Sequence, residues 1–363
     1  MHVLCVAGAR PNFMKIKPVM EALGARSVQM TLVHTGQHYD PSLSAVFFDE
    51  LGLRPPDYHL DVGSGTHAQQ TARVMLAFEP LVEELAPDVV VVVGDVNSTL
   101  AAALVAAKSR SLLAHVEAGL RSRDRTMPEE INRTVTDRVS DYLFAPSSDA
   151  VQNLRAEGHR PESIHLVGNV MIDTLLANAQ RARARPVLES FGVKSGSYGL
   201  VTLHRPANVD DPRVLEGLLD ALGAIAADMP LIFSAHPRTQ RRLDRMKLPA
   251  GVRAISPVGY LDFIALEAGA AIVLTDSGGI QEETTVLGIP CLTLRDTTER
   301  PITVTEGTNR VVGRDPRRII HEAKTVLAEG VARRKPELWD GRAGERIAEI
   351  LVQFPIPASD NSV

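Results

Sequence analysis

Residues 87–98 have the sequence PDVVVVVGDVNS, a run of five valines with Pro-Asp before it and Gly-Asp after it. Valine is β-branched and favours strands, and an unbroken apolar run is typical of a strand that is covered on both faces. Such strands belong to parallel sheets, in which a crossover helix follows each strand. The segment therefore predicts a buried strand in a parallel α/β sheet.

Similar apolar runs lie on either side of the valines, each followed by a polar or glycine-containing turn and a helical pattern. In the first half they are VLCVA at 3–7, MTLVHTG at 30–36, LLAHVEAG at 112–119 and DYLFAPS at 141–147. In the second half they are YGLVTLH at 198–204, PLIFSAH at 230–236, VRAISP at 252–257, AIVLTDS at 271–277 and PCLTL at 290–294. This βαβ rhythm predicts two doubly wound α/β halves in succession.

Length and rhythm together predict two domains. A chain of 363 residues exceeds the roughly 250 to 300 residues at which single cores stop growing. The rhythm restarts after residues 165–168, so we expect one Rossmann-like domain over residues 1–166 and a second over residues 167–341. A final helical pattern at 342–354 is expected to return to the first domain.

Composition excludes several classes of protein. A hydrophobic content of 44% and a charged content of 23% are those of an ordinary globular protein. The formal charge of -5 has the wrong sign for a general nucleic-acid binder, and no apolar stretch approaches the roughly 20 residues of a membrane span. Cys5 and Cys291 lie in apolar runs, and no His or Cys spacing is typical of a metal site. No export signal is visible, so we expect a cytoplasmic protein without nucleic-acid, membrane, metal or cofactor partners.

The turn after the first strand carries two cations. Gly8-Ala9-Arg10-Pro11-Asn12 opens a helix, and Lys15 lies one turn further on. The unpaired N–H groups of a helix N-terminus attract anions, so this turn predicts an anion site; the alternative is a solvated pair that caps a surface helix. The turn matches neither G-x-G-x-x-G nor a Walker A loop, which argues against dinucleotide binding and nucleoside-triphosphate hydrolysis.

A second anion site is predicted in LTDSGGIQEE at 274–283. Ser277-Gly278-Gly279 follows a strand and starts a helix, so its N–H groups can hold a diphosphate. A carboxylate on the next turn, Glu282 or Glu283, can accept both hydroxyls of a ribose. The alternative is an ordinary helix start with Ser277 as its N-cap.

Carboxylates follow strand ends in the first half at Asp95 and Glu117, and Glu130 begins a helix. Carboxylates that converge raise one another's pKa and so provide acid and base partners. The alternatives are N-caps for Asp95 and Glu117 and an i,i+3 ion pair between Glu130 and Arg133.

Histidines end two strands of the second half, at His204 and His236. A histidine at such a position can hydrogen-bond a diphosphate oxygen or donate a proton. Because ligands lie beyond the carboxyl ends of parallel strands, we expect the ligand between the two domains.

Taken in order, seven segments resemble the non-hydrolysing UDP-N-acetylglucosamine 2-epimerases. They are GARPNFMK at 8–15, Gly94-Asp95, HVEAGLR at 115–121, PEEINR at 128–133, His204-Arg205, LTDSGGIQEE at 274–283 and RDTTERP at 295–301. The resemblance implies a two-domain glycosyltransferase-B architecture and a homodimer. It implies interconversion of UDP-GlcNAc and UDP-ManNAc, for which elimination of UDP to a 2-acetamidoglucal and readdition is the accessible route.

The resemblance also implies roles for individual residues. The catalytic set is Asp95, Glu117, Glu130 and His204. The substrate-binding set is Arg10, Lys15, Arg133, Val258, Phe263, Ser277, Gly278, Gly279, Glu283 and Arg300. Gln37, His38 and His236 resemble part of a second, allosteric UDP-GlcNAc site of some bacterial members, although GSGTHAQQ at 63–70 departs from the pattern expected there.

Two departures from the family's sequence pattern leave the identity of the substrate sugar undecided. Residues 206–210 lack the basic and acidic pair that often follows the His-Arg pair, and Ile302 stands where a glutamate often follows the arginine-proline pair. A nucleotide of a 2,3-diacetamido uronic acid is therefore an alternative substrate. A glycosyltransferase of the same architecture, a hydrolysing epimerase and an inactive UDP-sugar sensor also stay open. The presence of Asp95, Glu117 and His204 argues against the sensor.

Overall fold

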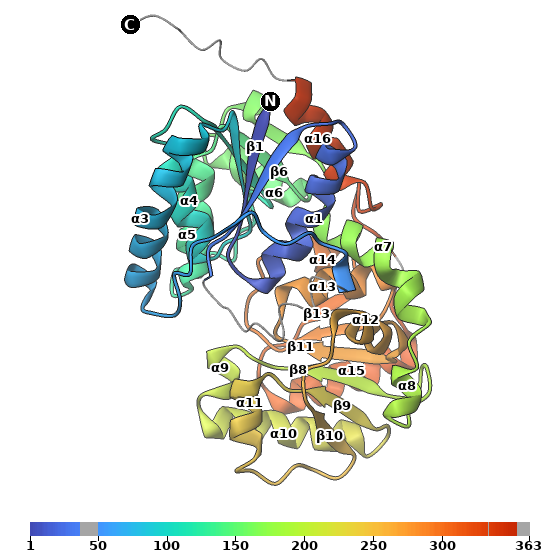
Figure 1. The fold of residues 1–363 in the computed structure, drawn as a ribbon. Helices are drawn as coiled ribbons and strands as arrows, with labels where there is room; N and C mark the ends of the chain where they lie inside the picture. The colour runs from blue at the N-terminus through green and yellow to red at the C-terminus, as the bar shows by residue number, and fades with distance from the viewer. Residues whose placement is uncertain (37–49, 333, 354–363) are drawn as a thin grey trace, which may run out of the picture. The chain divides into compact units, whose positions relative to one another are not determined.

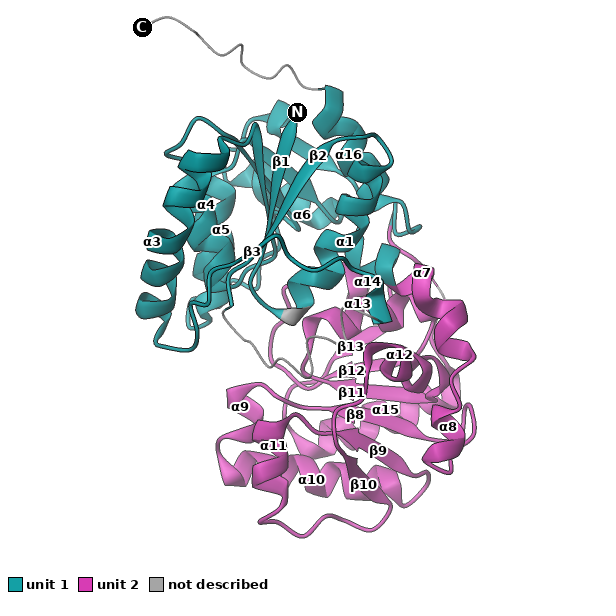
Figure 2. Cartoon of the chain, viewed as in Figure 1, with its two compact units in different colours: residues 1–174, 337–363 teal, residues 175–336 magenta. Residues whose placement is uncertain are grey.

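The computed structural model describes residues 1–36, 50–332 and 334–353, apart from the side chain of Arg10. The chain divides into two compact units, Met1–Thr174 with Glu337–Val363, and Leu175–Pro336 (Figure 2). Each unit holds a parallel β-sheet with helices packed on it (Figure 1). The predicted fold class is therefore confirmed.

Among the described residues, the sheet of unit 1 has seven parallel strands in the order β3-β2-β1-β4-β5-β6-β7. They are β1 (His2–Ala7), β2 (Gln29–His34), β3 (Tyr58–His59), β4 (Val89–Val93), β5 (Leu112–Val116), β6 (Tyr142–Ala145) and β7 (Ile164–Leu166). The five valines form β4 at the centre, and all are buried. The strand order reverses between β1 and β4, and such a switch point is where open sheets bind ligands.

Helices cover both faces of this sheet (Figure 1). On one face lie α3 (His67–Leu85), α4 (Asn97–Ala106) and α5 (Pro128–Val139). On the other face α1 (Arg10–Gly24) packs along α16 (Ala343–Gln353). The unit also contains α6 (Ser148–Ala156) and the 3-10 helix η1 (Pro161–Ser163).

Buried hydrogen bonds tie the C-terminal segment to unit 1. The Asp173 carboxylate accepts the N–H groups of Ala343 and Gly344 at 3.1 and 2.7 Å, which caps the start of α16. The Trp339 indole N–H donates to the carbonyl of Pro146 at 2.9 Å. The segment after residue 336 therefore completes the first unit.

In the described part of unit 2, six parallel strands follow the order β10-β9-β8-β11-β12-β13. The strands are β8 (Gly199–Thr202), β9 (Leu231–Ser234), β10 (Val252–Ile255), β11 (Ile272–Thr275), β12 (Cys291–Thr293) and β13 (Asn309–Val311). The helices are α8 (Val187–Ser190), α9 (Pro206–Val209), α10 (Pro212–Ala226), α11 (Pro237–Leu243), α12 (Tyr260–Gly269), α13 (Gly278–Leu287), α14 (Ile302–Thr305) and α15 (Pro316–Glu329). The boundary between the units falls within α7 (Val170–Arg183).

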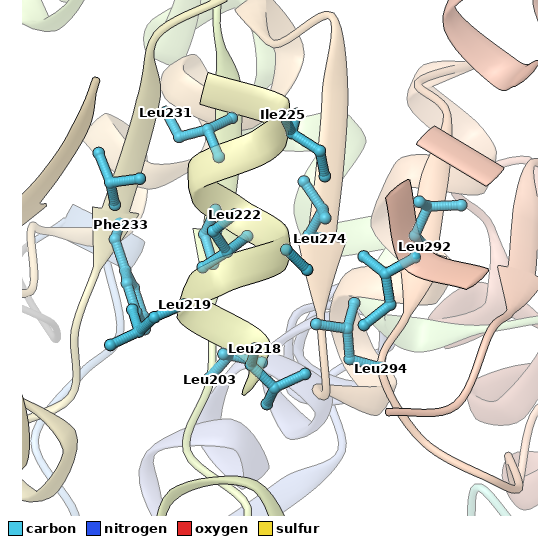
Figure 3. Packing of buried hydrophobic residues seen from close by; sticks show 14 of the residues in the cluster. Leu203, Leu218, Leu219, Leu222, Ile225, Leu231, Phe233, Leu274, Leu292 and Leu294 are labelled. Carbon is cyan, nitrogen blue, oxygen red and sulfur yellow. The ribbon is translucent and has the colours of Figure 1, made fainter. Parts of the chain in front are cut away.

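Helix α10 supplies much of the core of unit 2 (Figure 3). Its leucines and Ile225 recur at helical spacing and turn one face towards the sheet. The same buried cluster includes the strand side chains of Leu231, Phe233, Leu274 and Leu292. Each such side chain contributes about 1.5–3 kcal/mol when fully buried, so this packing fixes the sheet edge that carries the second group of candidate residues.

No helix within residues 1–36, 50–332 and 334–353 combines the length and the apolar character that a membrane crossing requires.

Candidate active site

Lys15 and Glu117 meet at the turn that follows β4. Lys15 Nζ donates to Glu117 Oε2, and both side chains are buried. A Cβ atom added to Gly94, which has φ +72°, would lie 3.3 Å from both Lys15 Nζ and Glu117 Oε2. The structure therefore brings the two predicted residues together beside the residue that precedes Asp95.

Arg133 of α5 joins the other two carboxylates of the predicted set. Its Nη2 donates to Asp95 Oδ2, and its Nη1 donates to Glu130 Oε2. The side chain of Asp95 is 29% exposed, whereas those of Glu130 and Arg133 are 7% and 3% exposed. Asp95 is therefore the member of this trio that a ligand reaches most easily.

Both oxygens of Glu130 accept hydrogen bonds from the turn before α5. They accept the N–H groups of Ser122 and Arg123 at 2.9 and 2.8 Å, and Oε2 also accepts the Ser122 hydroxyl at 2.9 Å. Burial tends to raise the pKa of Glu130, but the Ser122 N–H and the charge of Arg133 outweigh it and hold that pKa below its ordinary value. The i,i+3 pair with Arg133 is formed, so Glu130 fixes both the 122–123 turn and Arg133.

Two asparagines that were not predicted as site residues fix the same loops. Asn12 Oδ1 accepts the N–H of Ala9 at 2.9 Å, and its Nδ2 donates to the carbonyl of Val93 at 2.9 Å. Asn132 Nδ2 donates to the carbonyl of Asp95 at 2.9 Å. Both lie in segments of the family resemblance, but the bonds from their amides to the carbonyls of Val93 and Asp95 join distant residues and so leave no spacing pattern.

The predicted allosteric residues are only partly described. Gln37 and His38 lie outside the described residues, as does the side chain of Arg10. His236 is exposed, and its Nδ1 accepts the N–H of Arg238 at 3.3 Å at the start of α11. Allosteric binding of a second UDP-GlcNAc stays a prediction.

In unit 2, His204 is held by Asp276, which was not among the predicted site residues. His204 Nδ1 lies 2.8 Å from Asp276 Oδ1. Asp276 is fully buried and also accepts the N–H groups of His204 and Arg205 at 3.0 and 2.9 Å and Asn208 Nδ2 at 3.0 Å. Burial tends to raise the pKa of Asp276, but these hydrogen bonds and the charge of His204 hold it below its ordinary value. The pair fixes the imidazole, which remains 45% exposed.

A side chain at position 278 would displace the pair formed by Arg300 and Glu299. A Cβ atom there would lie 2.3 Å from Arg300 Nη1 and 2.5 Å from Glu299 Oε1. Arg300 is held against this turn by Glu299 and by Glu282, whose Oε1 lies 2.7 Å from Arg300 Nε. The structure therefore brings the predicted Gly278 and Arg300 together at the start of α13.

Guanidinium groups gather around Glu299 at this turn. Glu299 Oε2 accepts from Arg295 at 2.7 Å, and Glu299 Oε1 lies 3.7 Å from Arg205 Nη2. With Arg300, three guanidinium groups face the two carboxylates of Glu299 and Glu282. These guanidinium groups and the N–H groups at the start of α13 make the turn suitable for an anion.

Glu283 is buried one turn into α13. Its Oε1 accepts from the Tyr260 hydroxyl at 3.2 Å. Burial, aided by the charge of Glu282, raises the pKa of Glu283 to about 8. Without a ligand this carboxyl is therefore mostly protonated near neutral pH.

Val258 and Phe263 flank the start of α12, and both are half-buried. The N–H of Phe263 donates to the carbonyl of Gly259 at 2.9 Å, within the first turn. Phe263 therefore offers a half-buried aromatic ring, a group that can stack on a base.

Known proteins are similar in sequence to this chain over nearly its whole length. The family model described as UDP-N-acetylglucosamine 2-epimerase matches residues 21–352. The curated UDP-N-acetylglucosamine 2-epimerase of Methanocaldococcus jannaschii is 43% identical, over 97% of this chain and 99% of its own length. The UDP-2,3-diacetamido-2,3-dideoxy-D-glucuronate 2-epimerase of Pseudomonas aeruginosa is 42% identical, over 98% and 100%.

Solved structures agree with these matches. The crystal structure of the M. jannaschii UDP-GlcNAc 2-epimerase in complex with UDP-GlcNAc and UDP superposes with a TM-score of 0.90 at 43% identity, over 97% of this chain and 99% of that one. The Neisseria meningitidis enzyme bound to UDP-GlcNAc superposes with a TM-score of 0.89 at 28% identity, over 98% and 100%. Both likenesses extend over nearly the whole chain.

Proposed function

The chain belongs to the UDP-N-acetylglucosamine 2-epimerase family, and we propose that it interconverts UDP-GlcNAc and UDP-ManNAc. The observation that carries the proposal is the set of carboxylates in unit 1, each paired with a cation. Asp95 pairs with Arg133, and Glu117 pairs with Lys15, on loops after neighbouring strands. A protein that only bound a UDP-sugar would not need two such pairs.

The chemistry explains why two carboxylates are needed. The C2 proton of the sugar has no adjacent carbonyl, so a carboxylate cannot remove it directly near neutral pH. Cleavage of the C1–O bond releases UDP with the bonding electrons and leaves a cation-like C1, which acidifies C2–H. A base then takes that proton, and C1=C2 forms as a 2-acetamidoglucal. Readdition of UDP at C1, with a proton delivered to the opposite face of C2, yields the epimer.

We assign the nucleotide end of the substrate to unit 2. The 277–279 turn and Arg300 would hold the diphosphate, and the exposed imidazole of His204 would stabilise it as it leaves. Glu283 would accept the ribose hydroxyls, and Phe263 would stack on the uracil near Val258.

We assign the sugar end to unit 1. Asp95 and Glu117 would stabilise the cation and move the two protons. Glu130 suits that task less well, because backbone N–H groups of the 122–123 turn hold both of its oxygens. Glu130 would instead hold Arg133 in place beside Asp95. Arg10 and Lys15 would add positive charge near the departing phosphate.

The second candidate is a 2-epimerase of a related UDP-2-acetamido sugar. The P. aeruginosa diacetamido-glucuronate epimerase is 42% identical to this chain, nearly as similar as the M. jannaschii enzyme at 43%. The two sequence departures do not decide between them. Asn208 is buried and donates to Asp276, and Ile302 is 5% exposed, so both serve the packing of unit 2.

Proton NMR in deuterated water tests the proposal. The purified protein is incubated with UDP-GlcNAc, and the anomeric and C2 signals are followed. We expect UDP-ManNAc with deuterium at C2 and no free ManNAc. Free ManNAc with UDP would identify a hydrolysing enzyme. If UDP-GlcNAc is not converted but the diacetamido uronic acid nucleotide is, the second candidate is identified. If neither nucleotide is converted, the protein is a transferase or a sensor.

We further propose that the enzyme acts as a homodimer in the cytoplasm and supplies a nucleotide sugar for cell-surface polysaccharide synthesis. Supporting the dimer, Leu76 on α3 is 73% exposed and Ile131 on α5 is 47% exposed, beside a mostly apolar groove of about 390 Å³. Exposed apolar patches of this kind are common at subunit interfaces. Sedimentation of the wild-type protein should give twice the 39.3 kDa mass of the chain. Sedimentation of Leu76→Glu should give the mass of a single chain.

Affinity for UDP should increase with pH because of Glu283. The protonated carboxyl must ionise to accept two ribose hydroxyls, and its pKa lies at about 8. Affinity is then weak below pH 8, rises through that pKa and levels off above it. Calorimetry should give a dissociation constant about tenfold lower at pH 9 than at pH 7. In Glu283→Gln, which has no titrating carboxyl there, binding should be weak and almost independent of pH; the same pH dependence in this variant would assign it elsewhere.

A further inference from the structure

Asp137, on the buried side of α5, contacts the loop that carries Glu117. It is fully buried, and its Oδ2 accepts the N–H of Gly119 at 3.0 Å and lies 2.7 Å from Arg121 Nη2. Its Oδ1 lies 2.6 Å from His115 Nδ1. One carboxylate thus binds three points of the segment 115–121, which surrounds Glu117.

His115 extends this contact to the loop that carries Asp95. Its Nε2 lies 2.8 Å from the carbonyl oxygen of Gly94, the residue before Asp95. A carbonyl only accepts, so Nε2 donates, and Nδ1 must also donate to bind the carboxylate of Asp137. Burial tends to raise the pKa of Asp137, but the charges and hydrogen bonds of His115 and Arg121 together hold that pKa below its ordinary value. His115 therefore joins the two loops through a hydrogen bond at each ring nitrogen.

The backbone of Glu117 needs such support. Its φ of +75° is in the left-handed region, which residues other than glycine rarely adopt and which persists only when the surroundings impose it. The N–H groups of Glu117 and Ala118 both donate to the carbonyl of Phe144 at 3.1 Å. The bond from Gly119 to Asp137 fixes the other end of this turn. The direction of the Glu117 side chain thus depends on the bonds at both ends.

We propose that Asp137 and His115 are positioning residues of the epimerase reaction, which aim the carboxylates of Glu117 and Asp95 through the backbone of Gly119 and Gly94. This inference rests on the function proposed above. Neither residue touches substrate in the proposal. Arg121 lies 2.7 Å from Asp137 and 2.6 Å from Glu157, so its positive charge is shared between these two carboxylates.

Asp137→Asn and His115→Ala test the proposal. In Asp137→Asn the amide keeps one acceptor oxygen but turns its N–H₂ group towards one of the donors that Asp137 binds. The loops that carry Glu117 and Asp95 therefore lose one of the bonds that fix them. We expect kcat to fall about 10- to 100-fold, as when the hydrogen-bond partners that orient metal ligands are removed, with KM and UDP affinity within about twofold of wild type. Imidazole added to His115→Ala should restore part of kcat, which a purely structural role would not predict. If Asp137→Asn does not fold, His115→Ala carries the test, since it leaves the Asp137–Arg121 pair intact.

Asp141→Asn is the matched control. Asp141 accepts the N–H of Leu113 at 2.8 Å at the opposite end of β5, so this variant loses a carboxylate that braces the same strand away from the site. It should melt earlier but keep wild-type kcat. Wild-type kcat in folded Asp137→Asn and His115→Ala, or losses in KM and UDP affinity as large as those in kcat, would overturn the inference alone. If the wild-type protein itself does not convert UDP-GlcNAc in the same assay, the proposed function is overturned, and this inference with it.

Discussion

Asp95→Asn is expected to lower turnover by two to four orders of magnitude while UDP affinity stays within about twofold of wild type. General acid–base groups contribute about 10²- to 10⁴-fold, and an amide neither takes nor gives the proton. UDP affinity should persist because the nucleotide is assigned to unit 2, in which no residue changes. Asp95 is the cleanest of the carboxylates to replace, since its side chain is 29% exposed and its partner Arg133 keeps the bond to Glu130.

Glu117→Gln should have a similar effect on turnover but a larger effect on stability. Its partner Lys15 is buried, and a buried charge that loses its partner is costly. Initial rates of UDP-GlcNAc conversion and calorimetric UDP binding measure the two effects separately. Glu129→Gln is the control, because Glu129 lies next to Glu130 on α5 but outside the proposed set. A loss confined to UDP binding in Asp95→Asn would remove Asp95 from the acid–base pair.

The two variants should also differ in their products. The group that removes the C2 proton is needed for elimination, whereas the group that returns a proton to the other face is needed only after it. The variant that lacks the second group should still release UDP and the 2-acetamidoglucal slowly. Detection of the glucal in one variant and not in the other would assign the two carboxylates to the two faces of C2.

The buried strands could be predicted from the sequence because their apolar runs are continuous. The valine run is β4, and LIFS in β9 and IVLT in β11 each begin with three apolar residues in a row. The strands β3, β7 and β13 were not among the predicted runs. They have two or three residues, such as Tyr58–His59, and lie at sheet edges where the order of strands ends. Short edge strands bury little apolar surface and so leave little pattern in the sequence.

The candidate site was predicted residue by residue but not as pairs. Lys15 and Glu117 were each selected, yet their bond joins residues 102 apart, and no periodicity reports a contact of that separation. The i,i+3 pair of Glu130 and Arg133 was foreseen as an alternative because helix geometry brings such residues together. Asp276 was missed because, unlike Glu130 and Arg133, it binds residues that are far away in the sequence. It lies inside the predicted motif, but its partners are 68 to 72 residues away.

Asp276→Asn is expected to produce the second large loss, about 10³-fold in kcat. The carboxylate of Asp276 accepts four donors, from His204 twice and from Arg205 and Asn208. Asparagine has one acceptor oxygen, and its N–H₂ group must face a donor in either orientation. The bond that fixes the tautomer of His204 is then lost, and loss of such a carboxylate beside a catalytic histidine costs up to about 10⁴-fold in a serine protease. Asp210→Asn, which breaks only the surface pair with Arg238, should leave kcat unchanged.

A double-mutant cycle decides how Asp276 acts. If the carboxylate works through the imidazole, adding Asp276→Asn to His204→Ala should cost little more than His204→Ala alone, because the orienting bond has nothing left to orient. If the carboxylate works mainly by holding the backbone of the 204–205 turn, its loss should be nearly as large in the absence of the imidazole. Initial rates for the four proteins give the coupling directly. We expect the effects of the two substitutions to be strongly non-additive. Of the four bonds that Asp276 accepts, the one from His204 Nδ1 comes from a group that can carry a proton to the leaving diphosphate, whereas the two backbone N–H groups and the Asn208 amide cannot.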